Sequence, residues 1–405
     1  MPDTTPLQAA RALQVASRVD AIEPFRVMEM VKAAASMTRA GQDVISMSVG
    51  EPDFTAPDVV ARAAMDAIAR GATQYTESLG LPALREAISA HYARAYGLDV
   101  PARRIVVTAG ASAGLLLACA ALVSEGDEVL MPDPSYPCNR HFVSAFGGKA
   151  VLVPSGPAER YQLTAAQVAE RWTGRTRGVI VASPSNPTGT SMTPDQTRDL
   201  VAAVRARGGF AIVDEIYQGL YYGEQPGDRA TSALSFGDDV ITVNSFSKYF
   251  SMTGWRLGWL VLPDSLVPAV EKLAQNLFIC APAIAQHAAL AAFHDDAIAV
   301  FEERRGEFRR RRDFLVPALR DLGFSVPVLP DGAFYVYADI TGVAHRDAQD
   351  SSTFGMAVLR DAHVAIVPGD DFGVAAPGRH VRFSYATKYE RIEEAVARLA
   401  RLLGR

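Results

Sequence analysis

The sequence predicts an α/β protein with two domains: a large domain built on a mainly parallel sheet of seven strands flanked by helices, and a smaller α+β domain. The length of 405 residues is enough for two domains. Seven short runs rich in β-branched residues alternate with helix-like segments, which is typical of a parallel sheet covered on both faces. After about residue 297 the pattern changes to a charged helix followed by separate strand candidates.

The seven strand candidates follow one another through the first two thirds of the chain. They span residues 104–108, 128–131, 149–153, 178–182, 210–213, 240–243 and 257–262. Helix-like segments lie between most of them, for example at 115–122 and 193–207. We therefore expect an N-terminal arm at 1–48 that also joins the smaller domain, a large domain at 49–296 and a small C-terminal domain at 297–405.

The predicted smaller domain begins with "FEERRGEFRRRRDFLVPALRDLGF", a charged helix at 301–324. Strand candidates follow at 333–338, 364–367 and 381–385. The chain closes with an amphipathic helix whose apolar residues recur at helical spacing, namely Ile392, Val396, Leu399 and Leu403.

Charge gives no indication of a nucleic-acid or membrane partner. The basic run at 309–312 is surrounded by acidic residues, so we expect a solvated, locally balanced helix face. These acidic residues are Glu302, Glu303, Glu307 and Asp313. The net charge of −5 at pH 7 likewise gives no general attraction to polyanions.

Composition favours an ordinary globular protein, with 49% hydrophobic and 21% charged residues. No apolar run approaches the ~18 residues of a membrane span, and the N-terminus has no secretory apolar core. The cysteines, Cys119, Cys138 and Cys280, form no CxxC pair and are too few for a disulfide framework. We expect a cytoplasmic protein without a metal site.

Polar residues follow four of the predicted strands, in "AGASAG", "SPSNPTG", "DEIY" and "NSFSK". Ligands of open α/β sheets bind beyond the carboxyl ends of the strands. The side chains delivered to this edge are Ser112, Asn186, Asp214, Tyr217, Ser245 and Lys248. The case for a site rests on their joint placement, because each residue alone has an ordinary structural explanation.

These residue types suit one particular ligand chemistry. Small residues at 110–114 allow backbone N–H groups at a helix start to approach a phosphate, to which Ser245 and Arg256 add a hydroxyl and a charged clamp. Lys248 is a candidate amine nucleophile for a carbonyl, since burial and the charge of Arg256 would lower its ordinary pKa of about 10.4. Asp214 can pair with a ring cation. Together they describe a pyridoxal 5′-phosphate site.

A serine hydrolase is the main alternative from the residues alone. "GASAG" also matches G-x-S-x-G between a strand and a helix, with Ser112 as nucleophile and Asp214 or a later acid orienting a histidine. The candidate histidines are His287, His294, His363 and His380. No HGGG-like motif precedes Ser112, and a hydrolase leaves Lys248, Asn186 and Arg256 unexplained.

The sequence resembles the class I aminotransferases, the aspartate aminotransferase-like enzymes of fold type I among pyridoxal-phosphate enzymes. The resemblance covers nearly the whole chain through motifs in the family's order. They are "VGEPDF" at 49–54, "TQYTESLGLPALREAI", "SPSNPTGT", "VDEIY", "SFSKYFSMTGWRLGW" and "VRFSYA" at 381–386. It implies amino transfer between an L-amino acid and a 2-oxo acid by a ping-pong mechanism.

The resemblance also implies roles around the cofactor. Lys248 would form the internal aldimine and carry the proton, Asp214 would keep the ring nitrogen protonated, and Tyr217 with Asn186 would hydrogen-bond the ring 3-oxygen. Tyr136 would stack on the ring. The phosphate would be held by the amides of Ala111 and Ser112, the Ser245 hydroxyl and Arg256.

Substrate and subunit contacts follow from the same resemblance. Arg382 would bind the substrate α-carboxylate, helped by Asn186 and the backbone at Gly50. Tyr75 would reach the phosphate of a neighbouring subunit, which implies a homodimer with shared active sites.

Specificity is where the sequence departs from the pattern. Aspartate aminotransferases of this subgroup commonly have lysine at the position of Ser112 and tryptophan at that of Tyr136, so we expect a neutral or aromatic amino donor. A pyridoxal-phosphate C–S lyase would use the same lysine and stays an alternative. A transcriptional regulator of this fold would need a DNA-binding domain, for which the roughly 45 residues before "VISMSVGEPDF" are too few.

Overall fold

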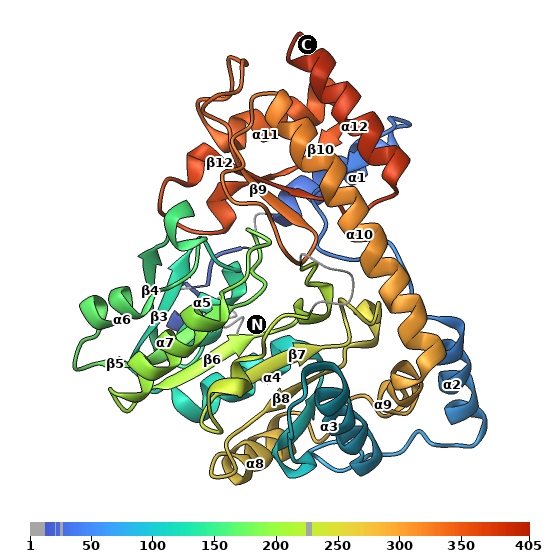
Figure 1. Cartoon of the computed structure of the whole chain (residues 1–405), viewed down its shortest axis with the longest axis vertical. Coiled ribbons are helices and arrows are strands. Elements are labelled where there is room, and N and C mark those ends of the chain that lie inside the picture. Colours follow the sequence, from blue (N-terminus) through green and yellow to red (C-terminus); the bar gives the residue numbers. More distant parts are fainter. Residues whose placement is uncertain (1–12, 21, 25–26, 224–228) are drawn as a thin grey trace, which may run out of the picture.

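The computed structural model describes residues 13–20, 22–24, 27–223 and 229–405. The first twelve residues of the predicted arm, and Phe25 and Arg26, lie outside this part of the chain. Figure 1 shows a broad sheet with its helices in the lower half of the molecule and a smaller sheet region above it, with one long helix running along both. The domain boundaries given above stay a prediction.

The main sheet has seven strands, as the sequence predicts. Their order across the sheet is β2 (Ile105–Thr108), β8 (Gly258–Val261), β7 (Ile241–Ser245), β6 (Phe210–Asp214), β5 (Thr176–Ala182), β3 (Glu128–Asp133) and β4 (Lys149–Pro154). Each begins and ends within two residues of its predicted position. All neighbours are parallel except β8, which runs antiparallel to both β2 and β7.

Alternate side chains of these strands point to opposite faces of the sheet, and each face is covered by an apolar layer. Ile180 and Ile212 pack under one layer, while their neighbours Val179 and Ala211 pack under the other. This is the period-two alternation of a strand buried on both faces. The first layer carries α4 (Gly110–Leu122), α5 (Pro137–Ser144) and α8 (Val267–Leu277), and the second carries α6 (Ala165–Arg171) and α7 (Pro194–Arg205).

The largest apolar cluster joins the β2–β8 edge of the sheet to the upper region. It contains residues of α2 (Asp58–Ala69), α3 (Pro82–Tyr96), α9 (Ala283–Leu290) and α10 (Asp295–Asp321). At 27 residues, α10 is about 40 Å long, so one helix can contribute to both regions. Figure 1 shows it in orange along the right side of both.

The upper region contains two small sheets. In the first, β11 (Val367–Pro368), β12 (His380–Ser384) and β9 (Tyr335–Asp339) pair antiparallel in that order. In the second, β1 (Ile45–Ser46) pairs parallel with β10 (Val364–Ala365), which brings the chain before residue 49 against the C-terminal region. Three helices pack around them: α1 (Val27–Arg39), α11 (Ser351–Ala362) and α12 (Tyr389–Leu402).

Two expectations need correction here. The predicted strand at 364–367 is two short strands, because the chain changes partner at Ile366 from β1 to β12. The run at 309–312 is charge-balanced but only partly solvated: Arg310 is exposed, whereas Arg311 and Arg312 are 3% and 5% exposed. They lie on the side of α10 that also buries Phe308 and Leu315, so helical periodicity turns them inward.

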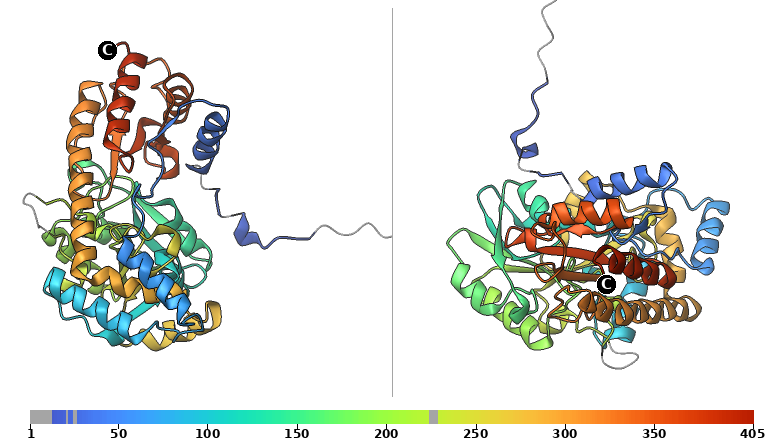
Figure 2. Two further views of the ribbon diagram at one scale, coloured as in Figure 1. Left: turned by 90° about the vertical axis from the view of Figure 1, so that its right-hand side faces the viewer. Right: turned by 90° about the horizontal axis from the view of Figure 1, so that it is seen from above.

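None of the helices in the described residues combines the length and the apolar composition that crossing a bilayer requires. Figure 2 shows the short helical turn Ser17–Val19 standing away from the main body of the chain. The exposed apolar side chains there include Leu13 and Val15.

Candidate active site

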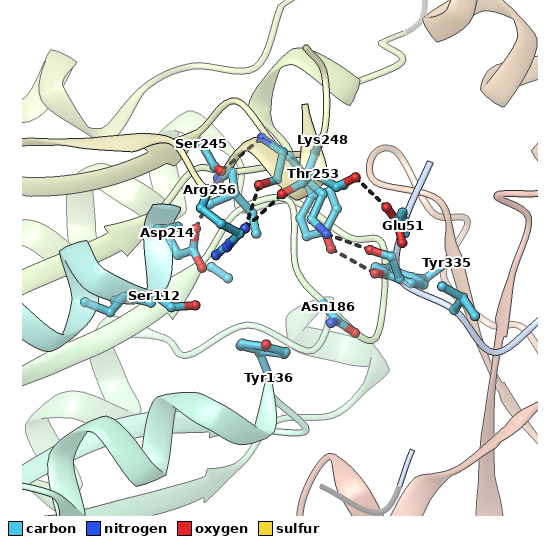
Figure 3. Close-up of a pocket in the computed structure, with 18 of the residues that line it drawn as sticks. Glu51, Ser112, Tyr136, Asn186, Asp214, Ser245, Lys248, Thr253, Arg256 and Tyr335 are labelled. Atoms are coloured by element: carbon cyan, nitrogen blue, oxygen red, sulfur yellow. Dashed lines mark hydrogen bonds between the residues drawn. The ribbon is translucent and has the colours of Figure 1, made fainter. Parts of the chain in front are cut away.

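A cavity of about 350 Å³ opens at the carboxyl ends of the parallel strands, between the main sheet and the upper region. Eleven of the twelve residues that the sequence predicts for the site line it. These are Gly50, Ala111, Ser112, Tyr136, Asn186, Asp214, Tyr217, Ser245, Lys248, Arg256 and Arg382. Figure 3 shows the labelled side chains surrounding one space, with Lys248 and Arg256 on one side and Ser112, Tyr136 and Asn186 on the other.

The lysine-bearing turn after β7 is fixed by its serines and phenylalanines. The Ser247 amide donates to the Ser245 hydroxyl (3.0 Å), which donates to the Leu257 carbonyl (3.2 Å). Phe246 is fully buried, with its ring centroid 4.9 Å from Phe250 and 5.0 Å from Trp259. Because the aromatic residues point into the core, Lys248 is left facing the cavity.

Lys248 is the amine of this cavity, and its surroundings make it less basic. Its Nζ donates to the Gly50 carbonyl at 2.6 Å. Burial lowers the pKa of Lys248 to about 8, and the charges of Arg256 and Arg382 lower it as well, against the opposing charge of Glu51. About a tenth of the side chain is therefore the neutral, nucleophilic amine at pH 7, far more than at its ordinary pKa.

The start of α4 offers backbone donors to an anion. The N–H groups of a helix's first turn have no partner within the helix, and no side chain caps this helix end. Gly110 has φ of +80°, and a Cβ there would lie 2.5 Å from Arg256 Nη2. A Cβ on Gly258 would lie 2.8 Å from the Ala111 nitrogen. Only glycine allows this close approach of β8, Arg256 and the helix end.

Arg256 completes the same end of the cavity. Its Nη1 donates to the Thr253 carbonyl (3.0 Å) and to the Ser247 hydroxyl (3.4 Å). Its φ of +52° is in the left-handed region, a conformation that costs a non-glycine residue about 1 kcal/mol or more. Within the described residues, Arg256 has no carboxylate within 4.0 Å. An anion bound here would meet the guanidinium and the helix end together.

Asp214 ends β6 and is 4% exposed. Its Oδ1 accepts from the Ile216 amide at 3.1 Å. Burial raises the pKa of Asp214 to about 7, although this amide and the charge of Lys248 act in the opposite direction. A buried carboxyl with so little compensation favours a cationic partner, which would return it to the ionised form.

Arg382 reaches the cavity from β12 and is 2% exposed. Its Nη1 donates to Asn186 Oδ1 (2.9 Å) and its Nη2 to the Ser48 carbonyl (2.6 Å), while its Nε has no hydrogen-bond partner. No carboxylate in the described part of the chain forms an ion pair with it. A buried guanidinium without a counter-ion is costly unless a ligand supplies the negative charge.

Tyr217 and Tyr335 form a hydroxyl pair, with their Oη atoms 2.8 Å apart. The Tyr335 ring also lies under the Arg382 guanidinium, 4.4 Å from its ring centroid. A Cβ on Gly50 would lie 2.5 Å from Tyr335 Oη, so glycine is required there too.

Sequence reasoning missed Tyr335, and it also missed Glu51 and Thr253 at the cavity mouth. Glu51 lies inside "VGEPDF", one of the motifs of the family resemblance, and its carboxylate accepts from the Thr253 hydroxyl. That position in "VGEPDF" was the available signal. No sequence signal pointed to Tyr335, because it lies within a predicted strand whose partner strands were unknown.

Two predicted groups lie outside the cavity. Tyr75 is 80% exposed and does not line it. None of the seven histidines, all of them in the described residues, lines it either, so no histidine base accompanies Ser112. The geometry therefore gives no support to the serine hydrolase.

Comparison with known proteins identifies the family of the chain. Residues 42–399 match the family model for aminotransferase class I and II. A valine–pyruvate aminotransferase of Mycobacterium tuberculosis is 41% identical, over 93% of this chain and 96% of its own length. A probable aspartate/prephenate aminotransferase of Aquifex aeolicus is 36% identical, over 96% of this chain and 98% of its own.

Solved structures agree on the fold. The crystal structure of an aminotransferase from Mycobacterium tuberculosis gives a TM-score of 0.92 at 40% identity, covering 97% of this chain and 100% of that one. Class I aminotransferases of this fold use pyridoxal 5′-phosphate. The chain therefore belongs to the class I and II aminotransferases and is a pyridoxal-phosphate enzyme that transfers an amino group between an amino acid and a 2-oxo acid.

Proposed function

We propose that the protein transfers the amino group in two half-reactions at this single cavity, a ping-pong mechanism, with Lys248 as its catalytic lysine. One observation supports this most: a less basic lysine faces a cavity with two arginines, and neither arginine has a carboxylate partner among the described residues. The first product would leave before the second substrate binds, because both carboxylates need the same Arg382.

The cavity fits pyridoxal 5′-phosphate. The uncapped start of α4, the Ser245 hydroxyl and Arg256 would hold the phosphate, with the amides of Ala111 and Ser112 as the backbone donors. The cofactor supplies an electron-withdrawing ring that stabilises negative charge at the substrate Cα.

Three side chains would orient and tune that ring. Asp214 would hold a proton at the ring nitrogen, since a cation there lowers the pKa of this buried carboxyl below about 7. Tyr217, with Asn186, would donate to the ring 3-oxygen. Tyr136 would lie against a ring face, opposite Lys248 across the cavity as Figure 3 shows it.

Lys248 would carry out the proton transfer. Its Nζ would hold the cofactor through its aldehyde and, as a free amine, would move the proton at the substrate Cα. Arg382 would hold the substrate carboxylate through its guanidinium group, with Asn186 and the backbone at Gly50 beside it. Holding that carboxylate fixes which bond of Cα faces the lysine.

We further propose that the amino donor is neutral or aromatic. Ser112 and Tyr136 stand where a lysine and a tryptophan would serve a second carboxylate, and both line the cavity. The relative named for valine supports this proposal, whereas the one named for aspartate and prephenate supports the alternative. Single-turnover kinetics with alanine, valine, methionine, phenylalanine and aspartate decide between them. A strong preference for aspartate would overturn the proposal.

The exposure of Tyr75 supports a further part of the proposal. At 80% exposed, this side chain is available to a second copy of the chain, and we propose a homodimer in which it contacts the phosphate in the other subunit's site. Sedimentation at the working concentration, with and without cofactor, tests the dimer.

The central proposal is tested by reduction with borohydride followed by peptide mapping. We expect a pyridoxyl group on Lys248 and on none of the other lysines, for example the exposed Lys272 on α8. An adduct at another lysine, or none, would contradict the assignment.

A further inference from the structure

Tyr335 is a cavity residue to which the proposed mechanism gives no role. It is 1% exposed, lies on β9 and lines the cavity. The hydroxyl lies 2.8 Å from that of Tyr217. Figure 3 shows Tyr335 on the side of the cavity away from Ser112.

The number of protons on this pair of hydroxyls determines which of the two is the hydrogen-bond donor. Each phenol has a single proton, and burial raises the pKa of both Tyr217 and Tyr335, so each keeps that proton at neutral pH. If Tyr217 gives its proton to the ring 3-oxygen, it has none left for Tyr335. The 2.8 Å contact is then a hydrogen bond only if Tyr335 donates to Tyr217.

Two neighbours hold Tyr335 in this position. The Arg382 guanidinium over its ring makes the phenol a stronger donor, because a nearby cation stabilises negative charge on the phenol oxygen and so acts to lower the pKa of Tyr335, against the effect of burial. Gly50 passes so close to the hydroxyl that a side chain there would displace it. The Tyr217 and Tyr335 rings also meet edge-to-face, with centroids 5.7 Å apart at 80°.

We propose that Tyr335 is a positioning residue that donates its hydroxyl proton to Tyr217, and so strengthens the hydrogen bond from Tyr217 to the 3-oxygen of the cofactor. Donation into a hydroxyl polarises it and makes it a better donor in turn. A stronger donor at the 3-oxygen stabilises negative charge there and weakens proton binding at the neighbouring Lys248–cofactor linkage. Tyr335 thus lowers the pH at which that linkage loses its proton. The inference rests on the proposed role of Lys248.

The test is a spectroscopic pH titration of the linkage in the holoenzyme and its variants. Tyr335→Phe keeps the ring under Arg382 and removes only the hydroxyl. We expect its midpoint to rise by about half a pH unit, in the same direction as a larger rise in Tyr217→Phe. Tyr337→Phe, on the same strand but outside the cavity, is the matched control and should leave the midpoint unchanged.

A double variant tests whether Tyr335 acts through Tyr217 or whether the two substitutions change the midpoint independently. Since Tyr335 acts through Tyr217, adding Tyr335→Phe to Tyr217→Phe should shift the midpoint no further. An unchanged midpoint in Tyr335→Phe, or a full additional shift in the double variant, would overturn the proposal. Gly50→Ala gives an independent arm, because it displaces the Tyr335 hydroxyl while keeping the residue, and should also raise the midpoint.

Failure of the proposed function would look different. A wild-type protein with no pH-dependent absorbance from a lysine-bound cofactor would overturn the role of Lys248, and the inference on Tyr335 with it. A wild-type protein that titrates, beside a Tyr335→Phe variant that titrates identically, would overturn the inference alone.

Discussion

Arg311 and Arg382 are buried to almost the same degree, at 3% and 2% exposed, but their surroundings differ. Arg311, on α10, lies between the carboxylates of Asp53 (2.8 Å) and Glu307 (2.9 Å). Arg382, on β12, contacts an amide oxygen and a backbone carbonyl, and its buried Nε has no hydrogen-bond partner. Both rest on aromatic rings, so the counter-ion is the main difference between them.

This difference separates a structural arginine from a ligand-binding one. Removing a charge from water is costly, and Arg311 recovers the cost within the chain through two ion pairs. Arg382 has no such partner among the described residues, so a ligand carboxylate is the group that would balance it. Burial of an arginine is therefore a weak indication of function, whereas burial without a counter-ion beside a cavity is a strong one.

The largest expected effect tests the cavity side of this comparison. Lys248→Ala should lower amino transfer by at least about 10⁴-fold, because the variant has no amine to join the cofactor or to move the proton. Its unfolding free energy should change little, since the phosphate end of the cavity does not depend on Lys248. The measurements are 2-oxo acid formation with a fixed donor and thermal unfolding. Lys272→Ala serves as the control and should retain full activity.

Arg382→Gln should give the next largest effect. Glutamine can still hydrogen-bond but has no charge for a carboxylate, so kcat/KM for the donor should fall by about 10²- to 10³-fold. Steady-state kinetics with one donor measure it. The control is Arg379→Gln, just before β12, where the arginine forms an exposed pair with Asp339 (2.7 Å). A similar loss in both variants would mean that Arg382 has no special role.

The structural side of the comparison predicts the opposite behaviour for Arg311→Gln. This variant leaves Asp53 and Glu307 without their shared cation, so the free energy of unfolding should fall by about 2–3 kcal/mol. Its kcat/KM below the unfolding temperature should stay within about threefold of wild type. Urea unfolding and kinetics on the same preparation measure both. Loss of activity without loss of stability would contradict the distinction drawn here.

The sequence alone located most of the cavity because its residues follow strands. Asp214, Ser245 and Lys248 come directly after buried apolar runs, and parallel strands deliver such positions to one edge. That inference needs only local periodicity and one rule of sheet topology. The motifs then supplied Arg382 and Asn186, which the structure joins by a hydrogen bond although they are 196 residues apart.

The sequence could not locate what depends on packing between distant elements. Tyr335 belongs to the cavity because β9 pairs with β12 and the resulting sheet faces Tyr217, and no local pattern contains that information. Arg311 was expected on a solvated face because its own helix supplies enough acidic residues. Its burial follows from the contact with Asp53, 258 residues away. The cavity role of Tyr75 stays a prediction.

The smallest expected effect concerns how far the charge of each arginine changes the pKa of Lys248. The neutral form of Lys248 captures the cofactor, so the capture rate of cofactor-free protein should rise about tenfold per pH unit and level off above pH 8, near the pKa of Lys248. Arg382 contributes to that lowered pKa through its charge. Arg382→Gln should therefore raise the midpoint by about half a pH unit, since removing a nearby cation favours the protonated lysine. Arg311→Gln should leave the midpoint in place, because its charge is already balanced by Asp53 and Glu307. Stopped-flow absorbance from pH 6 to 9 measures the midpoints of the wild type and the two variants. Equal shifts in both variants would contradict the prediction, because they would show that the carboxylates beside Arg311 do not cancel the effect of its charge on Lys248.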